Sequence, residues 1–147
     1  MTTKIRASLL LVALLAGGCG SDDEPAGPRV GPEADLPDQV VVFGADDDLG
    51  EFAPRPDWAP DAEDIEAAEE LLAAELAASD EEGLDELTAY VRQYAGVDGD
   101  ALEVNALCAT DSDWQESWIE VDDGGACYWN ATVVDGRVES FQVNGSG

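Results

Sequence analysis

The sequence contains no histidine, and its six Lys and Arg residues face 34 Asp and Glu residues, which gives a formal charge of −28. Without histidine, the chain cannot build a Ser–His–Asp or Cys–His catalytic centre, a histidine metal site or a histidine pH switch. A chain this acidic is repelled by the phosphates of nucleic acids, so we expect no nucleic-acid partner. Lys4 is the one lysine, and it lies in a segment that we expect to be removed, which excludes lysine Schiff-base chemistry as well.

The first 18 residues have the pattern of an export signal. Two positive charges precede the apolar run Ser8–Ala16, and two glycines follow it. A membrane-spanning helix needs about 20 apolar residues, so this shorter run predicts a cleaved signal peptide over 1–18. The segment Leu15–Cys19 (LAGGC) resembles the lipobox of bacterial lipoproteins, which implies that Cys19 carries a lipid anchor. The alternative is a plain secretory signal that is cut near Gly18 or Gly20.

The lipobox resemblance implies a location in the bacterial cell envelope, outside the cytoplasm. Gly20 stands where many lipoproteins of the inner membrane have aspartate, so the resemblance implies delivery to the outer membrane. If Cys19 is lipidated, Cys108 and Cys127 remain, and an even number of cysteines in an oxidising compartment predicts a structural disulfide. A redox-active pair would have a close spacing such as C-x-x-C, which these two residues lack.

Residues 19–60 are predicted to form an acidic, disordered tether. Gly20–Asp38 is rich in proline and glycine and has no aromatic residue, so it cannot bury enough apolar surface to offset the entropy of folding. The β-branched run Gln39–Gly44 predicts a short edge strand at 39–44. The folded domain is expected over 61–147.

The hydrophobic pattern of this domain is first helical and then alternating. Asp61 is the expected N-cap of a helix with one apolar stripe: Ile65, Ala68, Leu72 and Leu76. A second helix is predicted to start at Ser79, with Glu82 as its capping-box partner, and to end at Gly96. Four strands are predicted after it, at Leu102–Ala109, Trp114–Val121, Ala126–Val134 and Arg137–Asn144. The expected fold class is therefore α+β, with two N-terminal helices packed on a four-stranded antiparallel β-meander.

The sequence predicts no catalytic residue, no cofactor and no metal site. Its acidic turns contain residue types that bind calcium, but they lack the late carboxylate of a calcium loop. Aromatic side chains on alternating strands are more often part of the core, but Trp118 and Trp129 could instead share an exposed face and bind a glycan or an envelope protein. The candidate binding surface is therefore Trp118, Trp129, Asp122 and Asp123. The alternative is a small hydrolase with paired carboxylates, because some of the 34 acidic residues will lie at a suitable separation.

The second half of the chain carries three motifs, at Tyr90–Gly96 (Y-x-R-Q-Y-x-G), Val121–Gly125 (V-D-D-G-G) and Val143–Gly145 (V-N-G). Together they resemble a group of uncharacterised small bacterial secreted proteins and lipoproteins. The resemblance supports the expected location and fold and implies no activity. Among so many acids Arg92 of the first motif is expected to have a carboxylate partner, and with Gln93 it could cap strand ends or pair with Asp122 or Asp123 of the second motif. The leading interpretation is a membrane-anchored, non-enzymatic binding or accessory module of the cell envelope.

Overall fold

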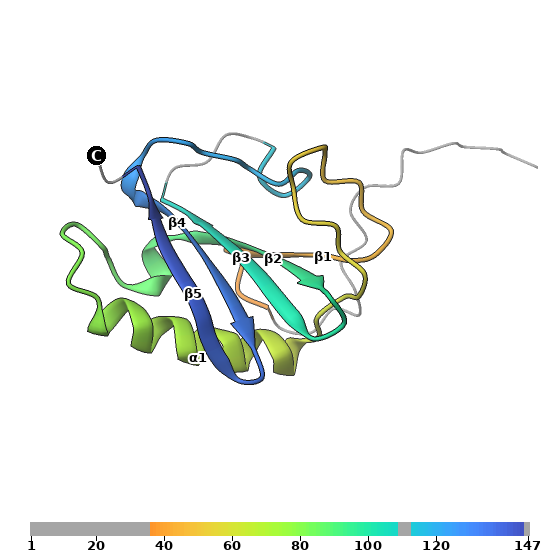
Figure 1. Cartoon of the computed structure of the whole chain (residues 1–147), viewed down its shortest axis with the longest axis horizontal. Coiled ribbons are helices and arrows are strands. Elements are labelled where there is room, and N and C mark those ends of the chain that lie inside the picture. Colours follow the sequence, from red (N-terminus) through yellow and green to blue (C-terminus); the bar gives the residue numbers. More distant parts are fainter. Residues whose placement is uncertain (1–35, 109–112, 146–147) are drawn as a thin grey trace, which may run out of the picture.

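The computed structural model describes residues 36–108 and 113–145, so the expected signal peptide and Cys19 lie outside the described residues. A five-stranded sheet has one helix on one face and loops on the other (Figure 1). The strands follow the order β1-β2-β3-β4-β5, with β1 parallel to β2 and the other neighbours antiparallel. The elements are β1 Val40–Phe43, α1 Ala62–Ala78, the 3-10 helix η1 Leu87–Ala89, β2 Val91–Val97, β3 Ala101–Leu107, β4 Gly125–Val134 and β5 Arg137–Asn144.

The expected fold class is wrong, because the described chain has one α-helix and a five-stranded mixed sheet in place of two helices on a four-stranded antiparallel meander. The segment expected to form the second helix contains a turn, η1 and then β2. β2 is buried without interruption from Arg92 to Gly96. A strand that is covered on both faces has no alternating pattern, so apolar residues such as Val91 and Tyr94 fit a helical spacing equally well.

Gly96, the expected end of that helix, lies within β2. Trp58 packs directly over it, and a Cβ at this position would lie 2.6 Å from the Trp58 ring. The backbone N–H of Asp57 donates to the carbonyl of Gly96 at 2.9 Å, and the indole N–H of Trp58 donates to the carbonyl of Val97 at 3.4 Å. The glycine is therefore required by the close approach of Trp58.

β1 occupies the sheet edge, at the place where the sequence predicts a strand over 39–44. Val41 and Phe43 are buried under the loops, together with Leu49 and Ala95. Val40 and Val42 point to the other face and pack against the core beneath α1. The folded domain therefore includes residues before Asp61 that the sequence analysis assigns to the tether.

α1 begins where the sequence predicts it. The Asp61 carboxylate accepts the backbone N–H groups of Glu63 and Asp64 at 2.9 and 3.0 Å, and the Asp64 carboxylate accepts the N–H of Asp61 at 3.0 Å. These bonds form a capping box. The predicted apolar stripe is confirmed, because the buried residues of α1 are Ile65, Ala68, Leu72 and Leu76.

A buried ion pair joins α1 to β2. Nε and Nη2 of Arg92, whose side chain is 1% exposed, donate to the two carboxylate oxygens of Glu69 at 2.8 Å each. The hydroxyl of Tyr94 donates to the same carboxylate at 2.7 Å. Burial, followed by the negative charge of Glu69, raises the pKa of Tyr94 far above its usual value, so this hydroxyl remains a donor. The expected partners of Arg92, Asp122 and Asp123, are wrong, because the pairing carboxylate comes from the helix.

Removing the Glu69 carboxylate should destabilise the domain. In Glu69→Ala, the buried guanidinium of Arg92 and the hydroxyl of Tyr94 lose their acceptor, so we expect the free energy of unfolding to fall by about 3 kcal/mol. Glu70→Ala is the matched control, since Glu70 is the next residue of the helix and is exposed; it should change stability by less than about 0.5 kcal/mol. Urea denaturation measures both, and equal midpoints for the two variants would contradict this role of the ion pair.

Candidate binding groove

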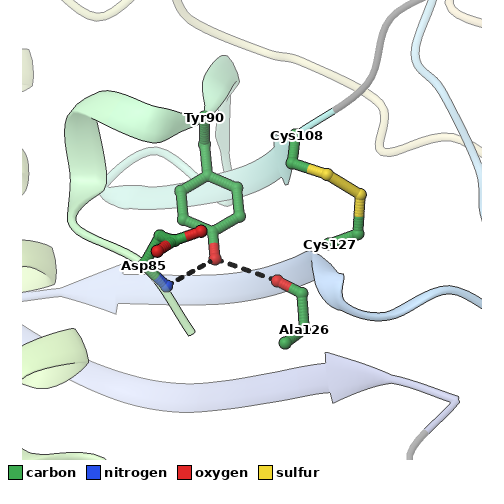
Figure 2. The surroundings of a disulfide bond; sticks show 5 residues. All are labelled: Asp85, Tyr90, Cys108, Ala126 and Cys127. Atoms are coloured by element: carbon green, nitrogen blue, oxygen red, sulfur yellow. Dashed lines mark hydrogen bonds between the residues drawn. A yellow bond between two sulfur atoms is a disulfide. The ribbon is translucent and has the colours of Figure 1, made fainter. Parts of the chain in front are cut away.

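Residues 113–124, between β3 and β4, cross the sheet face opposite α1, and a disulfide joins the residue after β3 to the start of β4. The predicted Cys108–Cys127 bond is present, with the two Cα atoms 5.0 Å apart, and the N–H of Cys108 donates to the carbonyl of Cys127 at 2.8 Å. Figure 2 shows Tyr90 beside it: its hydroxyl donates to the carbonyl of Ala126 at 2.9 Å and accepts the N–H of Asp85 at 3.0 Å. The disulfide and Tyr90 together fix the base of this segment, which we call the β3–β4 loop.

The described part of the β3–β4 loop is not the strand that the sequence predicts at 114–121. Side chains of the sheet, and not a neighbouring strand, bond its backbone. The amide nitrogen of Gln93 donates to the carbonyls of Trp114 and Ser117 at 2.5 and 2.7 Å, and its amide oxygen accepts the N–H of Ile119 at 3.0 Å. The amide nitrogen of Asn105 donates to the carbonyl of Ile119 at 2.6 Å and to the amide oxygen of Gln93 at 2.8 Å. Two buried amides therefore hold the loop on the sheet.

Gln93 and Asn105 begin a row of amide side chains that crosses the sheet. The strand register pairs Gln93 with Asn105, Asn105 with Asn130, and Asn130 with Gln142. Directly paired residues on antiparallel strands point to the same face, so the whole row lies on the face opposite α1. Gln93 and Asn105 are buried, Asn130 is half-buried and Gln142 is exposed. We call these four residues the amide row.

An open groove of about 1000 Å³ lies over the outer half of this face. Its floor consists of polar side chains from β3, β4 and β5: Glu103, Asn105, Asn130, Gln142 and Asn144. The loop after β1 contributes Phe52 and Arg55 to its sides, and the β3–β4 loop contributes Trp118, Glu120 and Asp122. The groove is also lined by Glu81, which follows α1, and by Val97 and Asp98 at the end of β2. Residues from four strands and several loops therefore meet in one site.

Hydrogen bonds fix the floor of the groove. The amide nitrogen of Asn130 donates to the amide oxygen of Asn144 at 2.8 Å, and the amide nitrogen of Asn144 donates to the carbonyl of Val121 at 2.9 Å. Beside them, the hydroxyl of Thr132 donates to Glu103 at 3.2 Å. Because these side chains already hold one another in place, a ligand meets hydrogen-bonding groups at fixed positions.

Glu103 is the carboxylate of the groove floor. Burial is the main cause that raises its pKa above the ordinary value of 4.5. The hydrogen bond from Thr132 opposes this shift, and the negative charge of Asp98, which also lines the groove, adds to it. A bound hydrogen-bond donor would stabilise the charged form of this carboxylate.

The structure separates the four residues that the sequence groups into one binding surface. Trp129 is fully buried on the helix face, 5.6 Å from Tyr90 between ring centroids. Trp118 lies on the opposite face, half-buried, with its ring centroid 6.3 Å from that of Phe43. Asp122 lines the groove with Trp118, and Asp123 is exposed beside it. Two of the four residues therefore belong to the groove.

Sequence reasoning missed the polar floor of the groove. Asn130, Gln142 and Asn144 occupy the polar positions of alternating strands, and such positions are normally assigned to a solvated face. The sequence did contain one signal: these positions carry neutral amides, whereas most polar residues of the chain are acidic. The proline-rich segment after β1 is consistent with a position of Phe52 on the domain surface, where 77% of this side chain is exposed, but its pattern does not specify the groove.

The described residues include neither a membrane-spanning helix nor a cluster of metal ligands. Within residues 36–108 and 113–145, no helix has both the length and the apolar character needed to cross a bilayer. The same residues contain no group of three or more Cys, Asp or Glu side chains placed to hold a metal ion.

Replacing Gln93 should release the β3–β4 loop from the sheet. In Gln93→Leu, the carbonyls of Trp114 and Ser117 and the N–H of Ile119 lose their partner, so we expect the Ile119 amide to exchange with solvent roughly ten-fold faster or more and stability to fall by about 2 kcal/mol. Gln142→Leu, at the exposed end of the amide row, is the control and should leave both unchanged. Hydrogen exchange measures the effect, and undiminished protection of Ile119 would show that Gln93 does not hold the loop.

The chain matches no protein-family model, no curated protein and no solved structure. The interpretation of the groove therefore depends on its own residues and geometry.

Proposed function

We propose that this protein is a membrane-anchored, extracytoplasmic binding module of the bacterial cell envelope that holds its ligand in the groove. The observation that carries the proposal is the groove floor, where polar side chains from three adjacent strands are fixed by hydrogen bonds and open to solvent. Fixed polar groups beside exposed aromatic side chains are typical of a recognition site.

The sequence before Leu36 supports the anchoring part of the proposal. It combines a signal-peptide pattern with a lipobox-like segment at Cys19, and Gly20 favours delivery to the outer membrane. The acidic segment between Cys19 and the domain would extend through charge repulsion and hold the groove away from the lipid surface. The Cys108–Cys127 disulfide fits an oxidising compartment outside the cytoplasm.

A second candidate function, hydrolysis by paired carboxylates, is favoured by one observation. Glu103 has a raised pKa in the groove, as a general acid would need, and Asp98 is a nearby second carboxylate. Binding is the better-supported function because Glu103 is hydrogen-bonded into a chain with Thr132 and Ser140, which fixes it as part of the floor.

The anchor is tested by Cys19→Ser. This change removes the thiol that would carry the lipid, so we expect the protein to move from the membrane pellet to the soluble fraction, with a shift of roughly ten-fold or more. Ser21→Ala is the control, because it lies two residues away and leaves the thiol intact; it should stay in the pellet. Mass spectrometry of the unaltered protein from its host should show an acylated Cys19. An unmodified Cys19 would contradict the anchor.

Binding in the groove is tested with material released from the host's cell envelope. We expect this material to slow hydrogen exchange in residues 118–122 of the full chain and to be recovered chemically unaltered after incubation. Glu103→Gln should keep this protection, since binding does not require an ionisable acid. Absence of protection would contradict the binding function. If the unaltered protein cleaves the material and Glu103→Gln does not, the function is hydrolysis instead.

A further inference from the structure

The groove face collects most of the neutral amide side chains of the protein. The sequence has four Gln and three Asn among 147 residues. Five of these seven lie on this one face: Gln93, Asn105, Asn130, Gln142 and Asn144. In a chain with 34 acidic residues, a face that only met water would be expected to carry Asp and Glu. Gln93, Asn105 and Asn144 use their amides to hold the β3–β4 loop, so Asn130 and Gln142 are the members of this set that can offer groups to a neutral ligand.

The outer members of the amide row, Asn130 and Gln142, keep hydrogen-bonding groups free for a ligand. No hydrogen bond from the described part of the chain reaches the amide oxygen of Asn130 or either end of the Gln142 amide. Within the described residues, Glu103 likewise accepts a side-chain hydrogen bond on Oε1 alone, from Thr132. Asn130 and Gln142 are directly paired on adjacent strands, about 5 Å apart, which is close to the width of one hexose ring, and Glu103 lies diagonal to Asn130 on the next strand, roughly 7–8 Å away. Amides and carboxylates present the paired donors and acceptors that neighbouring hydroxyl groups require.

Two aromatic side chains stand at the sides of the groove. Phe52 is 77% exposed, and it is the one large hydrophobic side chain in the described residues that is left so open. Trp118 lines the same groove from the β3–β4 loop, and its ring packs against that of Phe43. An aromatic ring in this position can pack on the apolar C–H face of a sugar ring, and it loses little conformational freedom on binding.

The charges around the groove exclude an anionic ligand. Arg55 is the one cation among the residues that line it, whereas Asp98, Glu103, Glu120 and Asp122 are acidic. A polyphosphate, an acidic glycan or an acidic peptide would be repelled. A basic peptide would be attracted by these acids, and its backbone could also bond to the amides. The outer amides are uncharged and offer no charge to pair with a cation, so they favour a neutral ligand rich in hydroxyl groups over a cationic one.

We propose that the groove binds a neutral oligosaccharide, whose hydroxyl groups bond to the outer amide row and Glu103 and whose ring faces pack on Phe52 and Trp118. This inference rests on the proposed binding function and names the ligand class of the same site. It assigns the aromatic contacts to two separate loops and the hydrogen bonds to the sheet.

The test titrates the full-length protein, in a detergent that contains no sugar, with neutral tetrasaccharides of three linkages: cellotetraose, maltotetraose and chitotetraose. Calorimetry should show saturable binding of at least one of them. Its affinity should change by less than about two-fold between low salt and high salt, because no charge pair forms. Phe52→Ala and Gln142→Ala should each weaken binding roughly ten-fold or more. Glu66→Ala, on the exposed face of α1, is the control and should have no effect.

Each remaining outcome decides against the inference. Binding by none of the three tetrasaccharides, or equal affinities in the Phe52 and Gln142 variants and the unaltered protein, would overturn it. Binding of tetralysine or spermine in the groove that weakens steeply with salt would assign a cationic ligand instead. Phe52 and Gln142 are both exposed, so their substitution should leave the fold intact, and thermal unfolding of the two variants checks this. If envelope material still protects residues 118–122, the binding function survives and the ligand class alone is wrong.

Discussion

Arg92 and Gln93 are consecutive residues of β2, and because successive side chains of a strand point to opposite faces, each holds a different layer of the protein. Arg92 bonds to Glu69 of α1 on one face, and Gln93 bonds to the backbone of the β3–β4 loop on the other. Both side chains are buried, so each must have its polar groups paired within the protein. The positions of the helix and the loop relative to the sheet therefore depend on one short stretch of a central strand.

Local signals were sufficient for the parts of the fold that depend on local chemistry. The cap at Asp61, the helical stripe and the turn at Asp135-Gly136 were all readable from the sequence, and both turn residues have the positive φ that this dipeptide favours, 50° and 69°. Asp98-Gly99, with φ of 54° and 82°, is a signal of the same kind between β2 and β3. If Asp98-Gly99 had been treated as a hairpin turn, the residues before it would have been predicted to form a strand and not a second helix.

The groove depended on information that a local pattern does not contain. Trp118 and Trp129 were expected to share a face because both were assigned to strands, but Trp118 lies in a loop that has no strand partner. The amide row exists only through the register of β2 with β3, β4 and β5. A shift of one residue in any pairing would move its side chain to the opposite face, and register is a tertiary property.

The two sides of the groove differ in how firmly they are held, and this difference bears on how a ligand would bind. The β3–β4 loop is fixed by the disulfide at its base and by Gln93 and Asn105 beneath it, so Trp118 is already in place before a ligand arrives. Phe52 has no comparable support, although the prolines at 54 and 56 restrict the backbone that follows it. Ordering Phe52 would cost entropy on binding, whereas Trp118 and the amide floor would not. In the proposed site, the sheet and the β3–β4 loop would therefore be the preformed part, and the loop after β1 would be the side that adapts to a ligand.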